Sequence, residues 1–133
     1  MLTENETIYI LIRHLEDRGW KIGENYCLSH QRGIDIQASN GKKLMLIEVK
    51  GAKAHPTAAT KKRDFFSTGQ IKTHFGAAIV KSLKLKNQYP RAIIAIAHAD
   101  NELLRKHLVP LIPHLRKLDI RHYWVSKAEI IQS

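Results

Sequence analysis

Residues 32–51 of the chain, RGIDIQASNGKKLMLIEVKG, contain two apolar runs on either side of Asn40-Gly41. An Asn-Gly pair between apolar runs predicts a tight β-hairpin, because glycine supplies the positive φ that such a turn needs. We expect residues 34–38 and 44–49 to form its two arms.

Two acids and a lysine should meet at the end of the hairpin away from the turn. Folding brings Asp35, near the start of the first arm, beside Glu48 on the second, and strand alternation puts Glu48 and Lys50 on one face. Residues 44–49, LMLIEV, predict a central strand buried on both faces, where ionised groups are costly unless paired or metal-bound. This favours a functional site over the alternative of exposed residues on a half-buried strand.

Two adjacent carboxylates are suitable ligands for a hard divalent cation. Mg²⁺ prefers oxygen ligands and keeps several waters, and we expect Mn²⁺ to substitute for it. Such a cation polarises a phosphoryl oxygen and lowers the pKa of a bound water, and a neighbouring Lys50 can orient that water or neutralise developing charge. Phosphodiester hydrolysis requires both effects.

The arrangement of Asp35 and Glu48-Val49-Lys50 resembles the motif of the PD-(D/E)XK nuclease superfamily, which has an acid at the start of one strand and Glu-x-Lys on the next. Ile34 stands where that motif has Pro, a change that removes a backbone restriction but no chemical group. The resemblance implies a restriction-endonuclease-like fold. It also implies a metal held by Asp35, Glu48 and the carbonyl of Val49, with Lys50 positioning or activating water.

Two further site residues follow from the same resemblance. Gln70-x-x-x-His74 is similar to a Gln-x-x-x-Tyr helix motif of some branches, which implies that Gln70 helps to orient the site; the alternative is an exposed polar residue at a helix start. Branches similar to Holliday-junction resolvases carry another acidic ligand on the first helix. The first helix has an apolar stripe made of Ile8, Leu11, Ile12 and Leu15. The helical repeat places Glu4 within roughly 30° of the centre of this stripe and Glu6 nearly opposite it. Glu4 is therefore the expected ligand, and Glu6 is the expected capping-box partner of Thr3.

The positive charge of the chain is concentrated after the hairpin. The formal net charge is +10, and residues 50–86 contain nine lysines and arginines against one acid, Asp64. Such a field suits a polyanion, whereas the alternative is a solvated basic face that aids solubility. The residues that we expect to bind nucleic acid are Lys53, Lys61, Lys62, Arg63, Lys72 and His74.

The periodicity of the remaining sequence predicts an α/β fold with element order αβββαβαβ. At 133 residues the chain is expected to form a single domain, 1–133, with a mixed central sheet flanked by helices. A strand separated from its neighbour by a helix is expected to lie parallel to it. Helices are expected at 4–18 and 68–86, and residues 101–107 and 110–117 are expected to form one interrupted helix or two short ones. The expected strands are 20–22 with 26–29, 92–97, 120–125 and a short strand or helical turn at 127–131.

Several classes of protein are disfavoured by what the sequence lacks. The single cysteine, Cys27, cannot form an intramolecular disulfide, and there is no signal-peptide pattern or apolar run of membrane length, so we expect a cytoplasmic location. The glycines do not have the spacing of a phosphate-binding loop.

We therefore predict a Mg²⁺-dependent endonuclease or other nuclease, a hydrolase acting on DNA. It would recognise structure, ends or a partner protein rather than a long sequence, and a homodimer would place two sites on a duplex. The alternatives are a non-catalytic nucleic-acid-binding or assembly subunit with the same fold, and an RNA-processing enzyme.

Overall fold

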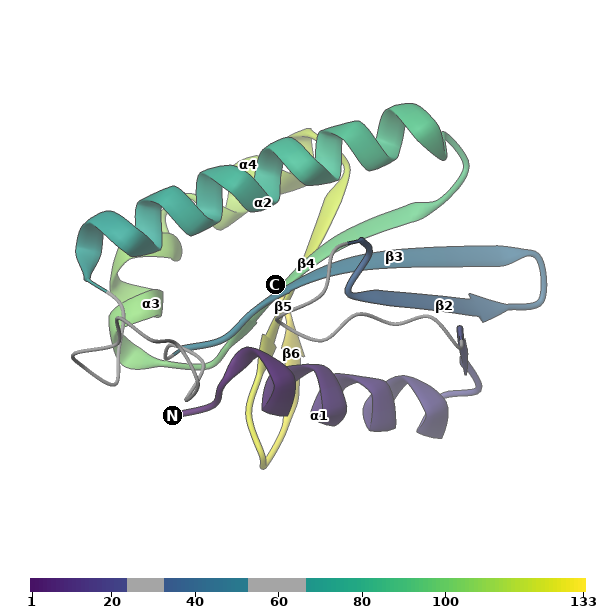
Figure 1. The fold of residues 1–133 in the computed structure, drawn as a ribbon, viewed down its shortest axis with the longest axis horizontal. Helices are drawn as coiled ribbons and strands as arrows, with labels where there is room; N and C mark the ends of the chain where they lie inside the picture. The colour runs from purple at the N-terminus through teal and green to yellow at the C-terminus, as the bar shows by residue number, and fades with distance from the viewer. Residues whose placement is uncertain (24–32, 53–66) are drawn as a thin grey trace.

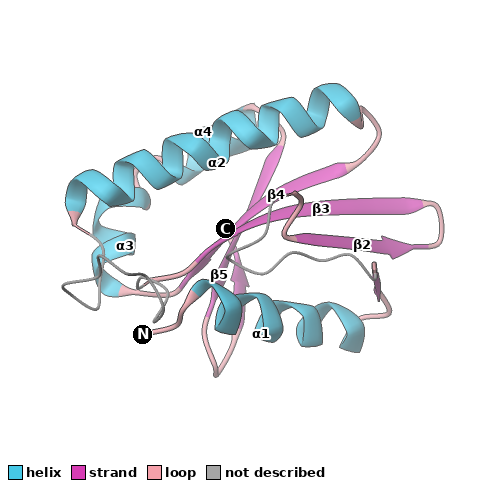
Figure 2. Cartoon of the chain, in the orientation of Figure 1, coloured by secondary structure: helices cyan, strands magenta, loops and turns pink. Residues whose placement is uncertain are grey.

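The computed structural model describes residues 1–23, 33–52 and 67–133, in which helices cover both faces of a central sheet (Figure 1). Figure 2 shows helix α1 on one face and helices α2 and α4 on the other. The elements are α1 (Glu4–Asp17), β1 (Lys21–Ile22), β2 (Ile36–Asn40), β3 (Lys43–Lys50), α2 (Thr68–Gln88), β4 (Ile93–Ala99), α3 (Glu102–Leu108), α4 (Ile112–Lys117), β5 (Ile120–Val125) and β6 (Ile130–Gln132).

The six strands form one mixed sheet in the order β1-β2-β3-β4-β5-β6. Strands β3, β4 and β5 are parallel to one another, whereas β1, β2 and β6 each run antiparallel to the neighbour with which they pair. The predicted mixed sheet, and the predicted parallel pairing of the strand that follows α2, are both confirmed. The region expected to hold one interrupted helix or two short ones contains two, and the expected strand at 26–29 lies outside the described residues.

The predicted hairpin is formed by β2 and β3. The register pairs Asn40 with Lys43 and Ile36 with Ile47, and Gly41 has a φ of 61° at the turn. Residues 45–49 are all buried. The central strand is therefore covered on both faces, as its apolar sequence predicts.

The two faces of β3 belong to different core layers. Met45, Ile47 and Val49 pack in one layer with Ile8 and Leu11 of α1. Leu46 of the opposite face packs with Ile94 of β4 and Leu85 of α2. Because Glu48 and Lys50 alternate with the first set, they belong to the face that α2 covers.

The four-residue spacing of apolar residues in α2 predicts that one stripe faces the core: Ile71, Phe75, Ile79 and Leu83. This prediction is correct only for the first half of the stripe. Ile71 and Phe75 are buried, but Leu83 is 43% exposed, and the inward-facing residues further along are Ala78, Ser82 and Leu85. Four residues span about 400° of helix, so a stripe of four-residue steps turns by about 40° at each step. After three steps it has left the face that meets the sheet.

Both long helices begin with a capping box. Thr3 and Glu6 exchange hydrogen bonds at the start of α1, as predicted, and Ser67 and Gln70 do the same at the start of α2. Among the described residues, no helix combines the length and the apolar character needed to cross a membrane.

Candidate active site

Asp35 lies immediately before β2 and is held by the backbone of β3. Its side chain is 5% exposed, and Oδ2 accepts a hydrogen bond from the N–H of Val49 at 2.8 Å. The two residues are 14 positions apart and are joined by the hairpin. The fold therefore brings the acid of the first arm to the Glu-x-Lys sequence of the second, as the sequence predicts.

Glu48 completes a buried pair of carboxyl groups. It is 4% exposed, so the alternative of an exposed strand residue does not hold for it. Burial, followed by a side-chain hydrogen bond with Glu48, raises the pKa of Asp35 to about 9, while the Val49 N–H acts in the opposite direction. Asp35 consequently holds a proton at neutral pH.

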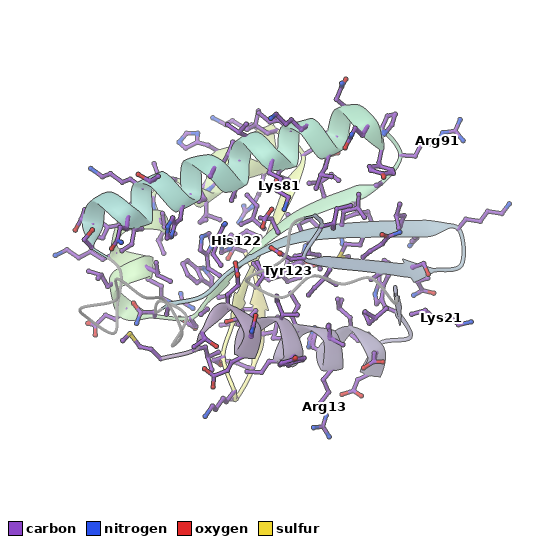
Figure 3. All side chains as sticks on the ribbon, in the orientation of Figure 1. Arg13, Lys21, Lys81, Arg91, His122 and Tyr123 are labelled. Atoms are coloured by element: carbon purple, nitrogen blue, oxygen red, sulfur yellow. The ribbon has the colours of Figure 1, made fainter. Side chains whose placement is uncertain are left out.

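Two lysines approach the two oxygens of Glu48. Lys81 Nζ of α2 is 2.8 Å from Oε2, whereas Lys50 Nζ is 4.0 Å from Oε1. Figure 3 shows Lys81 pointing from α2 toward the sheet. The contact with Lys81 is an ion pair by distance but lacks hydrogen-bond geometry, and the buried Oε2 receives no hydrogen bond from the described residues. Lys81 Nζ also donates to the carbonyl of Gly33.

Lys81 is not among the site residues predicted from the sequence. It does lie on the polar stripe of α2 that begins at Gln70 and continues through His74 and Ala77, with helical spacing to Lys81. That spacing was the available signal, because it places Lys81 three turns after Gln70 on one side of the helix.

The start of α1 abuts the end of β3. A Cβ added to Gly51 would lie 2.2 Å from the backbone nitrogen of Glu4, so the two backbones are in direct contact. Burial raises the pKa of Glu4, Lys50 lowers it, and the charge of Glu48 raises it, which puts Glu4 within electrostatic range of both. Glu6 is exposed and occupied by its capping box. The orientations of the two glutamates follow the predicted helical angles, and the role of Glu4 as a ligand stays a prediction.

The other predicted site residues lie either on α2 or outside the described residues. Gln70 is exposed in the first turn of α2, where its side chain accepts from the N–H of Ser67 at 2.8 Å, so here it serves the cap. His74 is half-buried; burial and then the charge of Lys50 lower its pKa. Lys72 is exposed on the same helix. The predicted contacts Lys53, Lys61, Lys62 and Arg63 lie outside the described residues.

A buried pair of histidines, also missed by the sequence analysis, lies beside Lys50. His98 of β4 is the register partner of Lys50, and its Nδ1 is 2.8 Å from Nε2 of His122 on β5. Burial lowers the pKa of His98 far below its usual value and that of His122 to about 3. Both rings are therefore neutral at neutral pH, and Trp124 packs against each of them.

The donor atoms fit a small hard cation. Asp35 and Glu48 offer adjacent carboxyl oxygens, and Glu48 Oε2 is a buried oxygen without a hydrogen bond from the described residues. Within those residues, no group of three or more Asp, Glu, His or Cys side chains forms a ready-made metal cluster. Mg²⁺ is commonly held by one or two carboxylates, with water and substrate phosphate completing its shell, so two carboxylates are sufficient.

The comparisons with known proteins bear on the fold. No protein-family model matches the sequence, and no curated protein matches it. A solved structure, that of an XisH family protein from Nostoc punctiforme PCC 73102, superimposes with a TM-score of 0.57 and covers 95% of this chain and 96% of its own. The two chains share a fold. With 16% sequence identity, the likeness to the XisH family protein extends to the fold alone.

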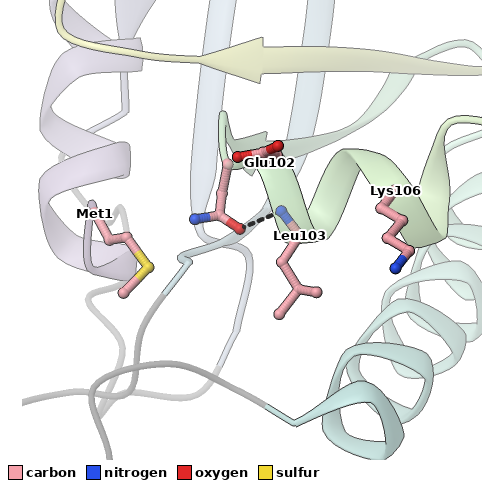
Figure 4. Close-up of a pocket in the computed structure, with 5 residues that line it drawn as sticks. Met1, Glu102, Leu103 and Lys106 are labelled. Carbon is pink, nitrogen blue, oxygen red and sulfur yellow. Dashed lines mark hydrogen bonds between the residues drawn. The ribbon is translucent and has the colours of Figure 1, made fainter.

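A pocket of about 410 Å³ lies elsewhere, at the start of α3 (Figure 4). Its lining consists of Met1, Asn101, Glu102, Leu103 and Lys106, and the Asn101 side chain accepts from the N–H of Leu103 at 3.0 Å. This lining includes neither carboxyl group of the pair. The carboxyl pair is therefore not part of this pocket.

Proposed function

We propose that the protein is a metal-dependent nuclease of the PD-(D/E)XK, restriction-endonuclease-like superfamily that hydrolyses DNA phosphodiester bonds. The observation that carries this proposal is the pairing of Asp35 and Glu48, both almost fully buried, with Lys50 on the same strand face as Glu48. The fold shared with the XisH family protein is consistent with it.

The energetics of the pair argue for function rather than stability. Removing ionisable groups from water is costly, and apolar residues of similar volume would often stabilise the same interior at least as well. A carboxyl whose pKa is raised by burial and by a second carboxyl is a frequent mark of a working site.

Each residue then has a defined task. Mg²⁺, or Mn²⁺ in its place, would be held by Asp35, Glu48 and the carbonyl of Val49, and when bound it would polarise a phosphoryl oxygen and acidify a water. Lys50, 4.0 Å from Glu48, would orient the attacking water or offset the charge that develops on the phosphate. Glu4 would support the site from the first turn of α1.

The choice of DNA as substrate rests on charge. A formal net charge of +10 favours a polyanion, and phosphate contacts of this kind do not depend on sequence. We infer that cleavage depends on DNA shape, ends or a partner protein, with a homodimer as one way to position two sites.

A cleavage assay with four substrates tests the proposal. Supercoiled, linear, branched and single-stranded DNA would be incubated with the protein in Mg²⁺, Mn²⁺ or EDTA, together with Asp35→Asn and the matched control Asp17→Asn at the exposed end of α1. We expect cleavage by the wild type and by the control, and none in EDTA or by Asp35→Asn. Equal activity of all three proteins would remove the assignment. Metal-independent DNA binding without cleavage would favour the non-catalytic subunit.

A further inference from the structure

Glu48 has a closer cationic partner than the lysine of its own strand. Lys81 Nζ is 2.8 Å from Oε2, while Lys50 Nζ is 4.0 Å from Oε1. Coulombic attraction grows as distance falls, so Lys81 contributes the larger share of the positive field at this carboxylate.

The two lysines reach Glu48 in different ways. Lys50 is fixed near it by the strand that they share. Lys81 comes from α2, and its side chain is 36% exposed. Its ammonium therefore contacts a buried oxygen while part of its aliphatic stem is in contact with solvent. A four-carbon stem allows the ammonium to leave without movement of the helix.

The position of Lys81 conflicts with a metal on the same oxygen. The buried Oε2 that Lys81 pairs with is one of the few oxygens that Asp35 and Glu48 can present to a cation. A divalent ion and an ammonium group repel each other, so the two compete for this oxygen.

We propose that Lys81 is an exchangeable counter-ion of the active site: it neutralises Glu48 until a divalent cation arrives, gives up Oε2 to that cation, and then presents its ammonium to a DNA phosphate. This inference rests on the proposed nuclease function. Lys81 also donates to the carbonyl of Gly33, two residues before Asp35, so its release frees α2 from the chain segment that leads into the site.

Metal binding without DNA distinguishes this role from that of a fixed structural ion pair. Mn²⁺ would be titrated into the wild type and Lys81→Met by electron paramagnetic resonance or calorimetry. The matched control is Lys84→Met, at an exposed lysine of the same helix. Because Lys81 competes with the metal, we expect Lys81→Met to bind Mn²⁺ at least about fivefold more tightly, a change on the scale of one ion pair. Lys84→Met should bind it like the wild type.

Cleavage completes the test. Lys81→Met should lower kcat/KM for DNA despite its tighter metal binding, and Lys81→Arg, which keeps the charge, should restore the Mn²⁺ affinity of the wild type. If Lys81→Met does not fold by circular dichroism, Lys81→Gln replaces it. Unchanged or weaker Mn²⁺ binding by the neutral variant would overturn the exchange role.

The failure of this inference can be told apart from failure of the nuclease proposal. If the site binds a metal, Glu48→Gln should weaken Mn²⁺ binding whether or not Lys81 exchanges with that metal. A wild type that binds no Mn²⁺, or a Glu48→Gln variant that binds it normally, would overturn both. Weakened binding in Glu48→Gln with no gain in Lys81→Met would overturn the exchange role alone.

Discussion

The carboxyl group of Asp35 accepts a hydrogen bond from the main-chain N–H of Val49, the residue that follows Glu48. The donor belongs to the central strand, so the position of Asp35 is fixed by backbone rather than by another mobile side chain. An Asn at this position can still accept the bond, whereas Ala would leave a buried N–H without a partner. Asn is therefore the cleaner probe of the chemistry.

Asp35→Asn should lose cleavage while keeping the fold. We expect a fall in kcat of more than about 100-fold, because even residues outside the first ligand shell of a metal commonly cost 10- to 100-fold. Single-turnover cleavage in Mg²⁺ measures the loss, and far-ultraviolet circular dichroism checks the fold. A variant that retained more than about a tenth of wild-type activity would show that Asp35 is not a ligand.

The contribution of Asp35 to the stability of the protein in EDTA should fall as pH rises. Asp35 has a folded pKa of about 9 against an ordinary value of 3.8, so between these pH values the folded chain keeps a proton that the unfolded chain releases. The free energy of unfolding then declines with pH by up to about 1.4 kcal/mol per unit from this one group. Urea denaturation at about pH 7.5 and pH 8.5, above the range in which the buried histidines His98 and His122 would gain a proton on unfolding, measures the slope. Asp35→Asn should flatten it, and an equal slope in both proteins would exclude this origin.

Glu4 and Glu6 should respond differently to the same substitution. Glu4→Gln removes a half-buried charge near Lys50 and Glu48 and should reduce metal-dependent cleavage with little loss of stability. Glu6→Gln is the control, since Gln can also accept the Thr3 N–H in the capping box. Cleavage rates and thermal melts compare the two variants. Full activity of Glu4→Gln would leave Glu4 as a helix-end residue only.

The basic triplet Lys61, Lys62 and Arg63 should determine part of the salt dependence of DNA binding. Replacing all three with Gln should weaken binding similarly across sequences and reduce the slope of log K against log salt by up to about three units, one for each phosphate that is no longer neutralised. Fluorescence anisotropy over a salt series measures the slope. The control is the triple Gln variant of exposed Lys21, Lys42 and Lys43, around the outer end of the hairpin. Equal slopes in both variants would place the DNA elsewhere.

Gly51 should tolerate no side chain, whereas Gly76 should accept one. A Cβ at Gly51 would lie 2.2 Å from the backbone nitrogen of Glu4, and Gly51→Ala should cost about 1–3 kcal/mol as the helix is forced from the strand. A Cβ at Gly76 meets nothing within 4 Å, and Gly76→Ala in mid-helix should stabilise by about 0.5–1 kcal/mol. Urea denaturation measures both. Equal stability of the two variants would contradict the close approach of α1 to β3.

The hairpin and its two acids could be predicted because their signals are local. Asn40-Gly41 sets the turn, and a period of two sets which side chains share a face. Lys81 was not selected, although it lies on the polar stripe that begins at Gln70, because its contact with Glu48 depends on how α2 docks on the sheet. The sequence of the helix alone does not encode that docking. His98 lies one position beyond the strand predicted at 92–97, and its contact with His122 depends on a register between β4 and β5 that neither strand encodes alone.

The order of the site residues along the chain affects the path of folding. Asp35 and Val49 are only 14 positions apart within a hairpin, and such local contacts form early, within microseconds for isolated hairpins. We expect the ammonium of Lys81 to arrive later, because α2 must first dock on the sheet. Until then Asp35 and Glu48 lie close together without the nearest cation. The hairpin should therefore close faster in chains whose Asp35 is already protonated. Acidity of the medium would then speed the assembly of a site that requires ionised ligands once it is in use.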